Sequence, residues 1–149
     1  MRFSAGYFME AAVEEALRAE SEGSVPVGAV AVADNKIIAA AGNEVIRTSD
    51  PTAHAEILVI RRACAFFGSP VVEQCDIYVT LEPCPMCLEA IFLSRVRRLY
   101  FGARDTKRTR LEKSDDPGNR SFAGTEIIGG IMETRCGDIL RNFFAKRRE

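Results

Sequence analysis

The residues best suited to chemistry in this chain are its single histidine and one closely spaced pair of cysteines. His54 begins the sequence His54-Ala55-Glu56, and Cys84 and Cys87 follow as a C-x-x-C pair. Proteins bind zinc through histidine nitrogen and cysteine sulfur, usually in a tetrahedron. One histidine and two cysteines leave the fourth position open, which is typical of a catalytic zinc site. The pattern therefore predicts a zinc ion that activates a water molecule as a nucleophile.

Glu56 is the acidic residue best placed to assist such a water molecule. Residues two apart on a regular helix are separated by about 200° around its axis. Glu56 is therefore not expected to bind the same metal ion as His54. A carboxylate beside the metal can instead accept a proton from the water and pass it on. We predict Glu56 as the catalytic proton shuttle.

Other interpretations of the same residues stay open on spacing alone. A C-x-x-C pair can be a thiol redox pair, and a lone histidine can be an ordinary hydrogen-bonded side chain. The chain has five cysteines, an odd number, which excludes a complete disulfide framework within one chain. Cys64, Cys75 and Cys136 lie in apolar surroundings and are expected in the core. A non-catalytic zinc or thiol-redox module is therefore the alternative from a different class.

The predicted metal ligands, the histidine and the cysteine pair, are each expected at the start of a helix. Asp50-Pro51-Thr52 supplies helix-start signals just before His54. Pro85 suits the first turn of another helix, because its missing N–H has no partner there in any case. Cys84 and Cys87 are then three residues apart at a helix start, where both sulfur atoms can face one way. The positive end of the helix dipole favours thiolates at that place.

Periodicity along the chain predicts nine elements in the order α-β-β-α-β-α-β-β-α. The helices cover residues 4–22, a segment from Asp50-Pro51-Thr52 to Gly68, residues 85–94, and a C-terminal segment marked by Cys136, Ile139, Leu140 and Phe143; the strands cover residues 25–32, 37–41, 77–81, 98–102 and 126–129. Asp34-Asn35 is a turn signal that makes the first two strands a hairpin. Residues 103–124 have no clear period and are interpreted as a long loop.

This order of elements predicts an α/β protein, a three-layer α/β/α sandwich with a mixed five-stranded sheet. The chain has 149 residues, 47% of them hydrophobic and 28% charged, which is typical of a globular protein. That length predicts a single domain over residues 1–149. The longest uncharged run has 11 residues, too few to span a membrane. No apolar stretch at the N-terminus resembles a secretory signal, so we expect a cytoplasmic protein.

The net charge of −1 conceals an asymmetry along the chain. Residues 1–60 carry a formal charge of −5, and residues 61–149 carry +4. The basic residues concentrate in segments 104–110 and 146–148. Such clusters can bind phosphate, or they can be a solvated loop and a basic tail.

Taken together, the motifs resemble those of the zinc-dependent cytidine and nucleoside deaminase superfamily, and more closely its bacterial tRNA adenosine deaminases. The resemblance covers about residues 7–105 and the last helix, and it is carried by residues 25–30, 50–57, 78–84, 101–105 and 143–144. It implies a cytidine deaminase-like fold and a homodimer. It also implies zinc-dependent hydrolytic deamination of adenosine to inosine at the wobble position of tRNA.

The resemblance also assigns roles to individual residues. His54, Cys84 and Cys87 match the zinc ligands, and Glu56 matches the proton shuttle. The positions that match substrate contacts are Val27 as an apolar wall of the base pocket, Asn43 beside the flipped nucleotide, Ala55 through its backbone, Asp105 beside a neighbouring nucleotide, and Phe143 in the helix that closes over the anticodon loop. Alternatively, Asn43 is a turn residue, Asp105 a solvated loop charge and Phe143 a core residue.

The segment after Asp105 departs from the family pattern. Relatives usually carry a lysine followed by small residues, whereas here Thr106-Lys107 precedes the bulky basic residues 108–113. Basic side chains of this kind can follow RNA phosphates. They are equally compatible with a different substrate, so a deaminase of a free nucleobase or nucleoside, such as guanine, cytosine or cytidine, is the alternative function.

Overall fold

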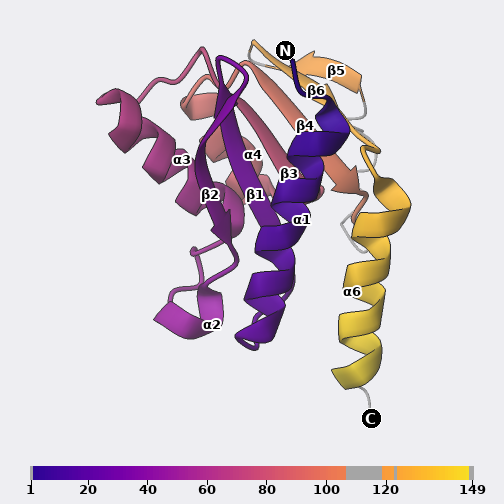
Figure 1. Cartoon of the computed structure of the whole chain (residues 1–149). Helices are drawn as coiled ribbons and strands as arrows, with labels where there is room; N and C mark the ends of the chain where they lie inside the picture. The colour runs from indigo at the N-terminus through magenta and orange to yellow at the C-terminus, as the bar shows by residue number, and fades with distance from the viewer. Residues whose placement is uncertain (1, 107–118, 123, 148–149) are drawn as a thin grey trace.

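The computed structural model of the chain describes residues 2–106, 119–122 and 124–147, and it shows a mixed β-sheet between two layers of helices (Figure 1). The sheet has six strands in the order β2-β1-β3-β4-β6-β5. The strands are β1 (Gly28–Ala33), β2 (Lys36–Gly42), β3 (Asp76–Leu81), β4 (Arg98–Ala103), β5 (Asn119–Phe122) and β6 (Thr125–Ile128). Strands β3, β4 and β6 run parallel, and the other neighbouring pairs are antiparallel.

Helices cover both faces of this sheet, which confirms the predicted three-layer α/β/α sandwich. They are α1 (Ala5–Ser21), α2 (Val45–Thr48), α3 (Ala55–Phe67), α4 (Pro85–Leu93) and α6 (Glu133–Arg147). One buried cluster joins α3 and α4 to the sheet, and a second joins α1 and α6 to it. Figure 1 shows α1 and α6 on one side of the strands and α3 and α4 on the other. The two ligand-bearing helices therefore share one layer.

The hairpin of β1 and β2 forms as predicted because its turn residues suit it. Asp34 and Asn35 both have positive φ angles, 52° and 61°. Two successive positive φ angles are typical of the two-residue turn that matches the twist of a hairpin. Every residue of β1 is buried, in agreement with its continuous apolar sequence.

The first helix is fixed at its start by a side-chain cap and along its length by close packing on β1. Ser4 is the N-cap, and its hydroxyl oxygen accepts a hydrogen bond from the backbone N–H of Tyr7 at 3.2 Å. The helix buries Met9, Ala12 and Val13, which recur at helical spacing. A Cβ atom at Gly28 in β1 would overlap the backbone of α1, so this close packing requires a glycine at that position.

The structure differs from the sequence prediction in two elements. The five predicted strands are present, but β5 is a sixth strand within the segment interpreted as a loop over residues 103–124. It adds to the edge of the sheet by antiparallel main-chain pairing with β6, which needs no apolar alternation in its own sequence. The short helix α2 was not predicted either.

The basic segment 107–113 lies outside the described residues. Among the residues that the structure describes, no helix has the length and apolar character that crossing a membrane requires.

Candidate metal centre and active site

The three predicted metal ligands lie at the starts of two neighbouring helices. His54 is the N-cap of α3, and Cys84 is the N-cap of α4. Pro85 occupies the first turn of α4, as predicted, and Cys87 follows within that turn. Helices α3 and α4 pack against each other, so their N-termini bring the imidazole and the two thiols together.

The distances between these side chains fit a tetrahedral zinc ion. The Nδ1 atom of His54 lies 3.7 Å from Sγ of Cys84 and 3.5 Å from Sγ of Cys87. All three ligand atoms lie within 4.8 Å of one another. Zinc bonds of about 2.0 Å to nitrogen and 2.3 Å to sulfur, at tetrahedral angles, place those atoms about 3.6 Å apart. The structure thus confirms the predicted convergence, and the donor set suits zinc.

The buried thiols could bind a metal only as thiolates, whose charge the metal cation itself would stabilise. The pKa of Cys87 is raised well above its ordinary value, first by its hydrogen bond with Cys84, then by burial and the nearby Glu56. Metal binding requires the deprotonated thiolate. A divalent cation supplies the positive charge that stabilises two thiolates in this covered position.

Glu56 is buried beside the three ligands, with only 4% of its surface exposed. Its pKa is raised from 4.5 to about 7, chiefly by burial and also by the nearby Cys84, although the backbone N–H of Glu56 itself, His54 and Cys87 lower it in part. A carboxyl group with a pKa near neutrality can both accept and release a proton. No metal-holding cluster among the described residues includes Glu56, as its position two residues after His54 predicted.

A cavity of about 170 Å³ opens over these groups and contains several of the predicted substrate residues. Its lining consists of Val25, Val27, Asn43, His54, Ala55, Glu56, Leu81, Glu82 and Cys84. Val27, Asn43 and Ala55 thus lie around Glu56. Val25, Leu81 and Glu82 were not singled out from the sequence, although Glu82 directly precedes the Pro83-Cys84 motif and Val25 flanks the first strand.

Hydrogen bonds fix both the backbone and the amide orientation of Asn43. Its backbone N–H donates to the carbonyl of Val27 at 2.9 Å, which joins the end of β2 to the residue before β1. Its side-chain Oδ1 accepts from the backbone N–H of Val45 at 2.9 Å. Because this bond directs the oxygen toward the start of α2, the amide presents its Nδ2 donors on the opposite side, where a ligand in the cavity can accept from them.

Asp105 lies in a second, larger hollow of about 720 Å³ beside the first. The two share Val25 and Leu81 in their linings. The backbone N–H of Asp105 donates to Oε1 of Glu82 at 2.9 Å, which ties the segment after β4 to the rim of the catalytic cavity. The walls of the larger hollow, called the outer groove below, also carry Arg104, Glu133, Arg141 and Phe144.

The structure does not place Phe143 in this groove. Phe143 is buried, with 6% of its surface exposed, and the guanidinium of Arg147 lies 4.5 Å from the centre of its ring. Phe144 lines the outer groove instead. Neighbouring residues on a helix point about 100° apart, so only one of the two can face the groove. The alternative noted for Phe143, a core residue, matches its position.

The fold and this site together define a class of protein. A three-layer sandwich, with a histidine and two cysteines at the starts of two adjacent helices and a buried glutamate beside them, is the architecture of zinc-dependent deaminases. Residues 4–103 match the family described as cytidine and deoxycytidylate deaminase zinc-binding region. The chain belongs to this family.

Individual relatives agree with that membership. The chain is 43% identical over 148 residues, 95% of each sequence, to the tRNA-specific adenosine deaminase of Agrobacterium fabrum. A solved structure from studies of A-to-I editing by tRNA:A34 deaminases at the wobble position of transfer RNA has a TM-score of 0.79 at 42% identity, covering 90% of this chain and 99% of that one. A guanine deaminase from Bacillus subtilis has a TM-score of 0.68 at 40% identity, covering 70% of this chain and 67% of that one.

Proposed function

We propose that this protein is a zinc-dependent hydrolase that converts adenosine to inosine at the wobble position of tRNA. In that reaction water supplies the oxygen of a new C6–O bond, the C6–N bond to the amino group breaks, and ammonia leaves. The names of the relatives support the proposal, since the protein from Agrobacterium fabrum and its counterpart from Bacillus subtilis are both called tRNA-specific adenosine deaminases.

The observation that carries the proposal is the outer groove beside the catalytic cavity. A free base needs only the small cavity, whereas a base that belongs to an RNA strand needs an open path for its flanking nucleotides. The outer groove provides such a path, and Arg104, Arg141 and Phe144 on its walls can contact phosphates and bases. Bases of an anticodon loop are unpaired, so one of them can be splayed into the cavity at modest cost.

His54, Cys84 and Cys87 would hold the zinc ion, which when bound activates a water molecule for attack on the base. Glu56 would accept a proton from this water and donate it to N1 of the purine ring, then take the remaining proton of the new C6–OH group and pass it to the amino group, which leaves as ammonia. Its burial keeps bulk water away from these transfers. The side chain is close enough to Cys87 for a hydrogen bond, which holds it beside the metal ligands.

The residues around the cavity bind the nucleotide in this proposal. Val27 contributes an apolar wall, and Ala55 offers a backbone N–H at the first position of α3. Asn43 donates from Nδ2, because its oxygen is bound to Val45. Asp105 contacts a neighbouring nucleotide from the outer groove, where Phe144, rather than Phe143, supplies the aromatic surface.

The protein is proposed to work as a homodimer in the cytoplasm. The helices that carry the metal ligands also carry large exposed apolar side chains, which include Phe66 at 63% exposure and Leu93 at 72%. Apolar side chains that are so exposed are typical of protein interfaces. Light scattering on the purified protein should give twice the chain mass, and Leu93→Glu should reduce it to one chain mass. A monomeric wild type would contradict this assembly.

A substrate panel tests the proposed reaction against its alternative. Because a solved guanine deaminase is 40% identical to this chain, deamination of a free base is the alternative that must be tested. The panel consists of an anticodon stem-loop with adenosine at the wobble position, the same stem-loop with guanosine there, and free adenine, guanine, cytosine and cytidine. We expect inosine and ammonia from the first RNA alone. Turnover of free bases without turnover of RNA would overturn the tRNA proposal.

A further inference from the structure

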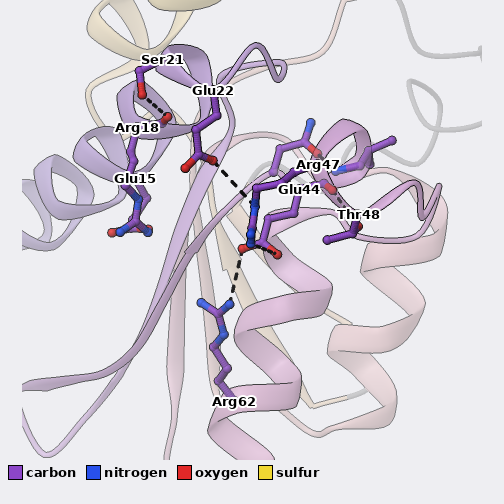
Figure 2. Close-up of polar contacts among 10 residues, drawn as sticks. Glu15, Arg18, Ser21, Glu22, Glu44, Arg47, Thr48 and Arg62 are labelled. Carbon is purple, nitrogen blue, oxygen red and sulfur yellow. Dashed lines mark hydrogen bonds and ion pairs between the residues drawn. The ribbon is translucent and has the colours of Figure 1, made fainter.

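The carboxylate of Glu44 forms ion pairs with two arginines beside the catalytic cavity. Its Oε1 lies 2.8 Å from a terminal nitrogen of Arg47, and its Oε2 lies 3.5 Å from one of Arg62 (Figure 2). Each carboxylate oxygen thus binds a different guanidinium. The side chain of Glu44 is only 16% exposed, although both arginines are about half exposed. The carboxylate is therefore the covered centre of the cluster.

Through these two arginines, Glu44 joins four parts of the fold. Arg62 lies on α3 and also donates to the backbone carbonyl of Ala40 on β2, which is the outermost strand on that side of the sheet. Arg47 lies on α2 and reaches Glu22, just beyond α1, at 3.9 Å. A single exposed ion pair contributes little to stability. A covered carboxylate with a partner on each oxygen forms a network, which fixes geometry better than an isolated pair does.

The backbone of Glu44 connects Asn43, which lines the cavity, to the residue that precedes His54. Its N–H donates to the carbonyl of Ala53, the residue before His54, at 3.0 Å. Its neighbour Asn43 points its amide oxygen at the N–H of Val45, the first residue of α2. The Asn43 amide is therefore bonded to the start of α2, and the ion pair between Glu44, the N-cap of α2, and Arg62 connects that place to α3.

Asn43 also separates two hollows. It lines the catalytic cavity on one side. On the other side it lines a polar hollow of about 330 Å³, whose walls carry Arg18, Glu22, Glu44, Arg47 and Arg62. The arginine cluster is thus the support behind the residue that faces the substrate.

We infer that Glu44 is a positioning residue for substrate binding, whose carboxylate, held between Arg47 and Arg62, fixes the side-chain amide of Asn43 in the catalytic cavity. The inference rests on the proposed function, because that function makes Asn43 a substrate contact. A rotated amide presents its oxygen, instead of its donors, to an acceptor on the nucleotide, and the hydrogen bond is lost.

Substitution of Glu44 by glutamine tests this role, because it removes the charge and keeps the size. For Glu44→Gln we expect KM for the anticodon stem-loop to rise by about tenfold, the scale expected when one hydrogen bond to the bound substrate is lost. The value of kcat should stay within about twofold, and the zinc content should be unchanged. Arg62→Ala should have the same effect. Glu126→Gln is the matched control, because Glu126 pairs with the exposed Arg98 at 2.9 Å on strands away from the cavity.

Double-mutant analysis separates positioning from general destabilisation. If Glu44 acts through Asn43, Glu44→Gln adds no further rise in KM in a chain that already carries Asn43→Ala. An independent and additive rise in the double variant would overturn the inference. An unchanged KM in the single Glu44 variant would overturn it as well.

A measurement without turnover keeps this test distinct from that of the proposed function. In NMR spectra of the zinc-loaded protein, the side-chain NH₂ resonances of Asn43 are identified by their loss in Asn43→Ala. They should shift in Glu44→Gln and stay in place in Glu126→Gln. If the wild type acts only on free bases, the tRNA proposal fails and this shift still decides the role of Glu44. Unmoved Asn43 resonances would refute that role.

Discussion

His54 and Cys84 occupy equivalent positions at the starts of neighbouring helices, and their Nδ1 and Sγ atoms lie 3.7 Å apart. Each residue is an N-cap with extended backbone angles, and its carbonyl accepts the first hydrogen bond of its helix. These bonds come from Leu58 to His54 at 3.1 Å and from Leu88 to Cys84 at 2.9 Å. The predicted metal ligands are therefore placed by regular secondary structure, which fixes them more firmly than flexible loops would.

Loss of one thiol should abolish metal binding. Cys87→Ala leaves His54 and Cys84 as protein ligands, which are too few to retain zinc against dilution. We expect the zinc content, measured by elemental analysis of the purified protein, to fall from one ion per chain to near zero, with loss of activity. Cys64→Ser is the control, because Cys64 lies outside the cluster and should keep one ion. Full zinc occupancy in Cys87→Ala would contradict the ligand assignment.

Glu56→Gln should separate catalysis from metal binding. The amide has the same size as the carboxyl group but cannot accept the proton from water, so we expect turnover to fall by about 10²- to 10⁴-fold. Zinc content should stay at one ion per chain, because Glu56 is not among the clustered ligands. The readouts are ammonia release and elemental analysis. Glu14→Gln on the exposed side of α1 is the control. If zinc is lost together with Glu56, the residue is a ligand and not a shuttle.

Local signals made several elements predictable from the sequence. The turn at Asp34-Asn35, the proline at the start of α4 and the apolar period of α1 each act within a few residues, so the sequence alone indicated them. The convergence of His54 with the two cysteines was predictable from the residue types and their spacing; in the structure it arises because β2 and β3 run in the same direction, so the helices after them start at one end of the sheet.

The remaining features depend on contacts between distant segments. Helix α2 has four residues and no apolar period, and it is held by bonds such as that from the N–H of Glu44 to the carbonyl of Ala53. The choice between Phe143 and Phe144 as the groove residue depends on how α6 packs on the sheet. The ion pair between Glu44 and Arg62 joins separate elements, and no local sequence pattern predicts it.

The stability of the protein should fall in alkaline solution, partly because of Cys75. Burial raises the pKa of this thiol from its ordinary 9.0 to about 11, and the neighbouring Asp76 adds to the effect. The unfolded chain therefore loses the proton first as the pH rises. The contribution of Cys75 to the free energy of unfolding is intact below about pH 9 and is lost between about pH 9 and 11, an expected change of about 3 kcal/mol.

Urea unfolding at several pH values, compared with that of Cys75→Ala, measures this contribution. The variant has a lower free energy of unfolding at neutral pH, because it loses a buried sulfur. The quantity of interest is the further decline between pH 7 and 10.5, which should be smaller in the variant than in the wild type. All other thiols and tyrosines are common to both proteins and cancel in the comparison. Equal declines would show that Cys75 does not contribute.

Gly28 should be the least replaceable glycine beside the site, because it sets the distance between α1 and β1. A Cβ atom at this position overlaps the backbone carbonyl oxygen of Ala12 and the backbone nitrogen of Ala16, neither of which can rotate away. Gly28→Ala should therefore lower the free energy of unfolding by about 3 kcal/mol, as severe overpacking does. The control is Gly6→Ala in α1, where the nearest atom lies 3.8 Å from the added Cβ and a small gain of about 0.5 kcal/mol is expected. Urea denaturation of both variants measures the difference, and equal stabilities would mean that the helix moves freely away from the strand.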